Sequence, residues 1–322
     1  MSSPIAPGIA PQTRRGLAGW ARRVATAGAV TVLALGGCNI KKITANTTAK
    51  NLEYGSVALD READLEFVRY AFPASLKTIE TFLVSSPDNR SLLLLLARGY
   101  NAYAFAIVEA DLERAQIDGP EERIESLSRR AKLHYLRARE YGFRWLDEPK
   151  LKEVAMAGDL EALDAELAKL EAEDVPGLFW AVYGWGSAVN LAKDDPQMMS
   201  GLSAVEKMMN RVYELDPHYN SGSPYALLGV YHASKPPALG GEPEVAKKYF
   251  DEGLAAHPEN LLLPYLTARF YAPMVQSREL FDEMIGKVAD ADVTEYPDLR
   301  LNNEIARERA RFWAMHVDEI IL

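Results

Sequence analysis

The sequence contains little cysteine and has a deficit of basic residues. Cys38 is its single cysteine, which excludes an intramolecular disulfide framework and any metal site built from several cysteines. The 322 residues include 36 Lys and Arg against 46 Asp and Glu, and the formal net charge is −10. Because Lys and Arg side chains supply most of the affinity of proteins for phosphates, we expect no nucleic-acid partner.

Recognisable catalytic motifs are also missing. No two of the five histidines stand four residues apart, as they do on zinc-binding helices, and no serine occupies a Gly-x-Ser-x-Gly turn. Gly184 and Gly186 begin like a dinucleotide-binding loop, but Val189 stands at the third glycine position. Close helix packing is therefore the favoured interpretation of these glycines. The sequence predicts no enzyme, no catalytic residue, no metal and no cofactor.

Patterns typical of strands are absent, and helical patterns run through most of the chain. No segment longer than a few residues alternates apolar with polar side chains, whereas apolar residues recur every three or four positions. One such stripe consists of Ile124, Leu127, Ala131, Tyr135 and Ala138. Prolines beside aspartates interrupt the stripes, and proline cannot continue a helix. We predict an all-α fold of about a dozen helices.

Apolar runs long enough to cross a membrane are lacking as well. The run Leu92–Leu96 is far shorter than the roughly 20 residues that a spanning helix needs, so we expect a buried helix there. Residues 24–35 form an uncharged run of 12 residues that follows four arginines and no acid. This length and charge pattern is typical of a bacterial export signal.

The export signal ends in Leu35-Gly36-Gly37-Cys38, which resembles a lipobox. We therefore predict a signal peptide at residues 1–37, lipidation of Cys38, and a lipidated N-terminus with a polar tether without helical order at residues 38–59. Asn39 favours the outer membrane over the inner one. An ordinary secretory signal with a chance cysteine is the alternative, and the arginines leave both the Sec and the twin-arginine export route open.

Small residues and prolines recur in the helical part, residues 60–322. Ala74, Ala204 and Ala246 are each followed by a proline about one helix later, and each is predicted to begin the second helix of a hairpin. Trp180, Tyr183 and Gly184 form a first-helix seam, and Tyr225, Leu228 and Gly229 repeat it. The pattern predicts a tetratricopeptide-like array of helical hairpins, an α-solenoid. An unrelated helical bundle with chance alanines and glycines is the alternative.

Candidate binding residues are aromatic or polar side chains on these helices. Aromatic residues at first-helix positions line either the core or a concave binding surface in helical arrays. Arginine and asparagine among apolar neighbours either reach a cavity or extend to water. The candidates for a ligand or partner are Tyr100, Trp185, Asn190, Tyr231 and Arg98.

Four segments resemble the T-component lipoproteins of tripartite ATP-independent periplasmic (TRAP) transporters. They are Trp180–Leu191, Met208–Ala233, Pro236–Phe250 and Asn303–Ala310. The resemblance implies a periplasm-facing lipoprotein of tetratricopeptide-like hairpins that forms small homo-oligomers and engages the extracytoplasmic solute-binding protein. It also implies that the loop containing Pro236, Gly240 and Gly241 is a family hallmark. It carries over no catalytic residue.

The expected function is therefore non-enzymatic. We expect an accessory lipoprotein of a TRAP-type solute uptake system, located in the bacterial cell envelope, that docks the solute-binding protein and offers its ligand an apolar passage. The alternative is an envelope-assembly scaffold that binds a murein enzyme or an outer-membrane insertion factor through a helical groove.

Overall fold

The computed structural model of the chain describes residues 40–234 and 241–321. Helices and turns make up this part, which contains no strand, so the predicted all-α array of about a dozen helices is confirmed. The predicted signal peptide, Cys38, Pro236 and Gly240 lie outside the described residues, and Gly241 is the first residue after the second gap.

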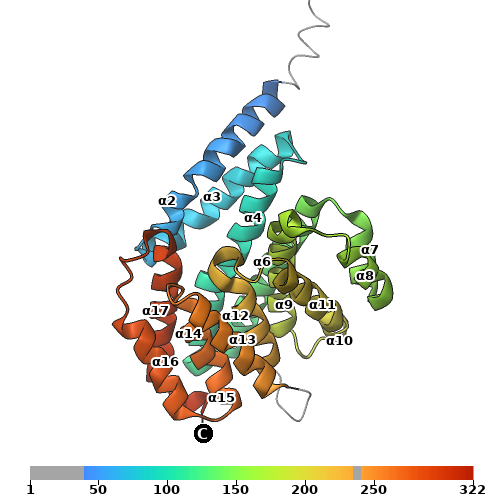
Figure 1. The fold of residues 1–322 in the computed structure, drawn as a ribbon. Coiled ribbons are helices and arrows are strands. Elements are labelled where there is room, and N and C mark those ends of the chain that lie inside the picture. Colours follow the sequence, from blue (N-terminus) through green and yellow to red (C-terminus); the bar gives the residue numbers. More distant parts are fainter. Residues whose placement is uncertain (1–39, 235–240, 322) are drawn as a thin grey trace, which may run out of the picture.

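The helices follow one another with short connections (Figure 1). The α-helices with defined bounds are α2 (Val57–Asp60), α3 (Leu65–Ser85), α4 (Arg90–Tyr103), α5 (Ala110–Asp118), α6 (Glu121–Leu146), α7 (Pro149–Ala157), α8 (Leu160–Leu167), α9 (Val175–Asn190), α10 (Pro196–Met199), α11 (Leu202–Leu215), α12 (Tyr219–Ala233), α13 (Pro243–Ala256), α14 (Leu262–Leu266), α15 (Ala272–Met274), α16 (Arg278–Asp290) and α17 (Arg300–Met315). The π-helices are η1 (Ala104–Glu109) and η4 (Thr267–Tyr271), and the 3₁₀ turns are η2 (Ala172–Asp174), η5 (Pro297–Leu299) and η6 (Val317–Glu319).

Side-chain caps explain where several of these helices begin. The Asp64 carboxylate accepts the backbone N–H groups of Glu66 and Phe67 at the start of α3. Asn89 and Ser277 cap α4 and α16 in the same way. Such a cap satisfies N–H groups that have no partner inside the helix and contributes about 1 kcal/mol.

Two hydrophobic cores organise the molecule. The larger one joins α3, α4, α6, α9 and α11, with the long helix α6 packed between α4 and α9. The second joins α14, α16 and α17 and lies in the C-terminal half. The hairpin of α12 and α13 stands between the two halves (Figure 1).

Glycines allow the closest helix contacts, as predicted for Gly184 and Gly186. A Cβ atom at Gly184 would lie 2.5 Å from the Tyr135 carbonyl oxygen on α6, and one at Gly186 would lie 2.7 Å from Met209 Cε. Gly142 similarly faces the backbone of Ala181 on α9. The glycines therefore set the short spacing between α6 and α9.

Two of the three alanines predicted to begin the second helix of a hairpin lie where they were predicted. Ala204 and Ala246 are buried near the starts of α11 and α13. The prediction for Ala74 was wrong, because this residue is exposed in the middle of α3. Asp64 caps α3 ten residues earlier, and Phe72 and Leu76 supply its buried face. That the hairpins are tetratricopeptide repeats stays a prediction.

The leucine run lies in a core helix. The continuous helix Arg90–Asp118, made of α4, η1 and α5, is the described helix long and apolar enough to span a membrane by length and composition. More than half of its most apolar window is buried in the fold, and Leu92, Leu93 and Leu96 are almost wholly buried. Its apolar face is used for packing.

The polar segment after Cys38 is ordered, contrary to the prediction of a tether without helical order. Residues 40–55 are helical and are called the N-terminal helix below. Ala45 and Ala49 are buried, and the Asn46 side chain accepts hydrogen bonds from Ser86 and Asn89. The polar composition gave little sign of a helix, because its packing face consists mainly of two alanines, which carry little hydrophobic signal, with Leu52 near its end.

Candidate functional site

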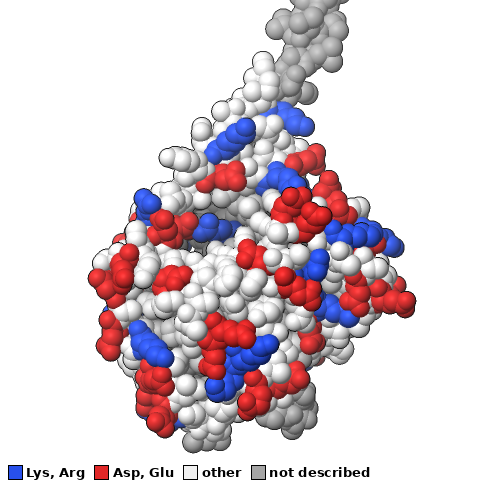
Figure 2. Space-filling model, in the orientation of Figure 1, with Lys and Arg blue, Asp and Glu red and all other residues white. Residues whose placement is uncertain are grey.

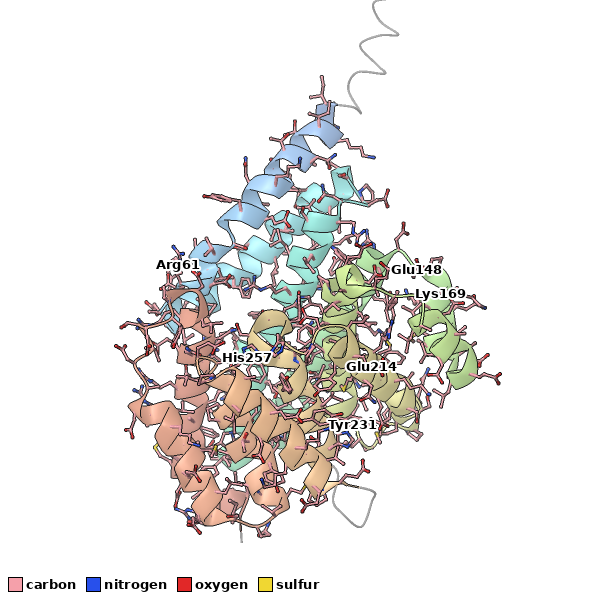
Figure 3. All side chains as sticks on the ribbon, in the orientation of Figure 1. Arg61, Glu148, Lys169, Glu214, Tyr231 and His257 are labelled. Carbon is pink, nitrogen blue, oxygen red and sulfur yellow. The ribbon has the colours of Figure 1, made fainter. Side chains whose placement is uncertain are left out.

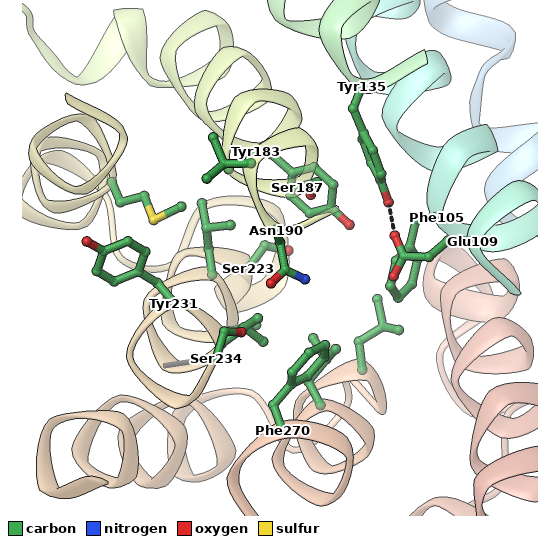
Figure 4. A pocket seen from close by; sticks show the side chains of 18 of the residues that line it. Phe105, Glu109, Tyr135, Tyr183, Ser187, Asn190, Ser223, Tyr231, Ser234 and Phe270 are labelled. Atoms are coloured by element: carbon green, nitrogen blue, oxygen red, sulfur yellow. Dashed lines mark hydrogen bonds between the residues drawn. The ribbon is translucent and has the colours of Figure 1, made fainter. Parts of the chain in front are cut away.

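A cavity of about 610 Å³ lies between the two halves of the molecule (Figure 4). Its walls come from η1, α6, α9, α10, α11, α12, α14 and η4. Most of the lining is apolar, including Phe105, Met209, Leu227, Leu266 and Phe270. A cavity of this size and character is typical of a small-molecule site.

One polar ridge crosses the cavity along α9. Tyr183, Ser187 and Asn190 follow one another at steps of four and three residues, so they share one face of the helix (Figure 4). Among the described residues, the Tyr183 hydroxyl and the Asn190 side-chain amide have no hydrogen-bond partner. Burial raises the pKa of Tyr183, so its hydroxyl stays protonated and can donate a hydrogen bond. The ridge therefore offers both donors and an acceptor to a guest.

Glu109 closes the other side of the cavity. Its carboxylate accepts a hydrogen bond from the Tyr135 hydroxyl at 2.5 Å, drawn as a dashed line in Figure 4. Burial and then the charge of Glu109 raise the pKa of Tyr135, which keeps this hydroxyl protonated. Arg309 Nη2 donates to Glu109 Oε1 at 3.3 Å, so the carboxylate is held from two sides.

A buried charge network lies behind Glu109. Arg309 Nη2 is 2.7 Å from Glu113 Oε2, and Arg269 Nε is 3.4 Å from Glu113 Oε1. Burial alone would lower the pKa of Arg309, but the carboxylates of Glu113 and Glu109 raise it above its ordinary value. Two guanidinium groups thus balance two carboxylates, and the network presents no net charge to the cavity.

Both π-helices of the described chain border this site. η1 places Phe105 and Glu109 on the cavity wall, and η4 places Phe270 there and Arg269 in the charge network. A π-helical turn inserts a residue into an α-helix and rotates the following side chains, and such turns are frequent at functional sites. Here they direct side chains of two long helical segments toward one space.

The rim of the cavity carries Lys193 and Tyr231. Lys193 Nζ donates to the Ser234 carbonyl at 3.1 Å, and burial followed by the charge of Arg269 lowers the pKa of Lys193. Tyr231 is one of the residues that line the cavity, and its hydroxyl donates to Glu206 at 2.7 Å; in Figure 4 its ring points away from Asn190 and Glu109.

An unusual backbone turn directly precedes the lining residue Ser223, at the start of α12. Asn220, Ser221 and Gly222 have φ angles of 48°, 54° and 76°, in the left-handed region. Asn260 donates to the Ser221 carbonyl at 2.8 Å and holds the turn in place. Consecutive left-handed residues are costly and persist only where the surroundings enforce them.

Two of the five predicted ligand or partner residues, Asn190 and Tyr231, line this cavity. Tyr100 is buried and donates to Glu80 at 2.6 Å, and Trp185 packs under Gly201 and beside Phe143. Arg98 pairs with Asp60 on α2. The structure therefore brings together two of the candidates and places three in contacts elsewhere.

Glu109 and Arg309 are functional-site residues that the sequence did not predict. They are 200 residues apart, and each belongs to a helix that reads as an ordinary amphipathic stripe with charged positions. The sequence signal that could have indicated Glu109 and Arg309 is a charged residue at a helix position where the amphipathic pattern calls for an apolar one. No group of three or more His, Cys, Asp or Glu side chains in residues 40–234 and 241–321 is arranged to hold a metal ion.

Comparison with known proteins identifies the family. The family model for the TRAP transporter T-component matches residues 61–321. A protein of Treponema pallidum (strain Nichols), described as uncharacterized, is 28% identical over 266 residues, which cover 81% of each chain. The family is an accessory component of TRAP transport and not an enzyme family. The chain thus belongs to the TRAP transporter T-component family, which works in the bacterial cell envelope.

Proposed function

We propose that this T-component docks the extracytoplasmic solute-binding protein of a TRAP transporter and holds the transported ligand in its central cavity. The observation that carries the proposal is the apolar cavity with its hydrogen-bonding ridge of Tyr183, Ser187 and Asn190. The Tyr183 hydroxyl and the Asn190 side-chain amide have no hydrogen-bond partner among the described residues. Polar groups left unpaired in an apolar space cost stability unless a guest or water pairs with them.

The lining defines the class of ligand. The apolar walls fit a mainly hydrocarbon body, and the ridge on α9 fits one edge that carries hydroxyl, carbonyl or carboxyl oxygens. The charge network behind Glu109 is neutral as a whole, so it favours no strongly charged group at that end. We therefore expect an elongated molecule with one polar edge.

Membrane attachment and assembly complete the proposal. A lipid on Cys38 would anchor the chain to the envelope membrane, with the outer membrane favoured, and several acyl chains make such an anchor lasting. The family resemblance supports a small homo-oligomer facing the periplasm. Both statements are tested by the mass of the purified lipoprotein and by light scattering of the detergent-solubilised protein.

Filling the cavity tests ligand binding. Leu227→Trp adds an indole to the apolar wall, and we expect it to weaken the binding of the apolar dye Nile red at least about tenfold, measured by fluorescence titration. Leu133→Trp, at an exposed position on α6, is the control and should bind as the parent chain does. If Leu227→Trp folds and binds the dye unchanged, the cavity is not the binding site.

A further inference from the structure

The outer face of the N-terminal helix exposes large apolar side chains. Ile40, Ile43 and Tyr54 are 65%, 57% and 89% exposed, although each has a large apolar side chain. With Thr47 and Lys50 they follow one another at steps of three and four residues, so the five side chains form a single stripe. Ala45 and Ala49 lie on the opposite, buried side.

The body of the protein holds this helix firmly. Asn46 Oδ1 accepts hydrogen bonds from Ser86 Oγ at 2.7 Å and from Asn89 Nδ2 at 2.8 Å. Ala49 belongs to the main hydrophobic core. The helix runs along the outer edge of the molecule in Figure 1, so its stripe has a fixed direction relative to the rest of the fold.

The charge of the segment differs from that of the chain. Lys41, Lys42 and Lys50 of this helix are exposed, with Lys50 in the stripe, against one acidic residue, Glu53, which accepts a hydrogen bond from Ser91; the whole chain has a net charge of −10. In Figure 2 the first part of the N-terminal helix carries blue side chains and no red ones on the face shown. Basic residues beside apolar ones suit a surface of anionic phospholipid.

The position of the proposed lipid supports this occupant. Cys38 stands two residues before Ile40, and two residues span at most about 7 Å. A lipid on Cys38 would therefore hold the first turn of the helix at the headgroups. A long flexible tether would not impose this closeness.

We propose that the outer face of the N-terminal helix lies on the anionic bilayer surface, with Ile40, Ile43 and Tyr54 among the headgroups and Lys50 near phosphates. The contact rests on the proposed lipidation of Cys38. It gives the body one orientation on the membrane, because the helix is packed rigidly against α3 and α4. Figure 3 shows Tyr231, at the cavity rim, in the half of the molecule away from this helix.

Tryptophan quenching tests the contact. The lipidated mature protein is reconstituted on vesicles of phosphatidylethanolamine and phosphatidylglycerol that contain brominated lipids. Ile43→Trp and Tyr54→Trp should both be quenched at least about twofold more than the parent protein and Met315→Trp, an exposed position on the last helix. The native tryptophans of the described chain are buried and give a low background; they are Trp145, Trp180, Trp185 and Trp313.

Each outcome has one meaning. A protein that sediments with vesicles while Ile43→Trp and Tyr54→Trp stay unquenched contradicts the helix contact and leaves the lipid anchor intact. Quenching of Ile43→Trp but not of Tyr54→Trp would show that only the start of the helix touches the bilayer, which contradicts contact along its whole outer face. A protein that carries no lipid and does not sediment contradicts the anchor instead. Lys50→Glu should reduce quenching, and an unchanged signal would overturn the electrostatic part.

Discussion

At the residue scale, Arg309 contributes most to the arrangement of the cavity. Its side chain is 3% exposed and bonds to Glu109, Glu113 and the Phe105 carbonyl. A single side chain of α17 thereby fixes both ends of the π-helix η1 and the carboxylate on the cavity wall. Such a residue is costly to remove, because its partners stay behind as buried charges.

Arg309→Met should therefore destabilise the fold. We expect the free energy of unfolding to fall by about 3–5 kcal/mol, measured by urea denaturation, because Glu109 and Glu113 lose their counter-charge. Adding Glu113→Gln should restore part of the loss. Arg278→Met, which breaks exposed ion pairs on α16, should cost less than about 1 kcal/mol. An Arg309→Met chain as stable as the parent would show that the network is not essential.

His134 should give the stability a pH dependence. Burial, followed by the positive charges of Arg137 and Arg130, lowers the pKa of His134 to about 4, below its ordinary 6.5. Between pH 6.5 and 4, His134 is therefore protonated in the unfolded chain but stays neutral in the folded chain. Stability from this group is complete above pH 6.5 and is lost as the pH falls toward 4.

His134→Gln should accordingly flatten the curve. The unfolding free energy of the parent should drop more steeply than that of the variant between pH 6.5 and 4, with a constant difference above pH 7. The measurement is urea denaturation at a series of pH values. Parallel curves across the whole range would contradict a depressed pKa for the imidazole that stacks on Tyr100.

At the element scale, the spacing of α6 and α9 depends on glycine. A Cβ atom at Gly142 would lie 2.6 Å from the backbone nitrogen of Ala181, and a backbone cannot move aside as a side chain can. We expect Gly142→Ala to cost about 1–3 kcal/mol of unfolding free energy. Gly286→Ala on α16 has open space around it and should be neutral or stabilise by up to about 1 kcal/mol. Equal effects of the two changes in thermal or urea unfolding would refute the packing argument.

The helices themselves could be predicted because their signals are local. Apolar stripes, proline breaks and small residues such as Ala204 and Ala246 depend on neighbours within one or two turns. The N-terminal helix could not be predicted, because its packing face is mostly alanine and Asn46 accepts hydrogen bonds from Ser86 and Asn89, about 40 residues away along the chain. The π-helices leave no sequence signal, since their extra residue is tolerated only through tertiary contacts.

At the scale of the whole molecule, the cavity arises where two cores meet. Asn190 and Tyr231 could be proposed as ligand residues because they lie in aromatic, apolar helices that resemble the family. Tyr100 and Trp185 had the same signal, yet they face the core between α4, α6 and α9. A sequence shows that an aromatic residue is buried but not whether it faces a cavity or the solid core, because that depends on helices far away along the chain.

At this scale we propose that the molecule, an accessory component of TRAP transport, engages a solute-binding protein. The most direct test is affinity capture with an immobilised chain that begins at Asn39 and is exposed to periplasmic extract of the source organism, with retained proteins identified by mass spectrometry. We expect near-stoichiometric retention of one TRAP solute-binding protein. Retention of murein enzymes or outer-membrane assembly factors, with no solute-binding protein, would contradict it.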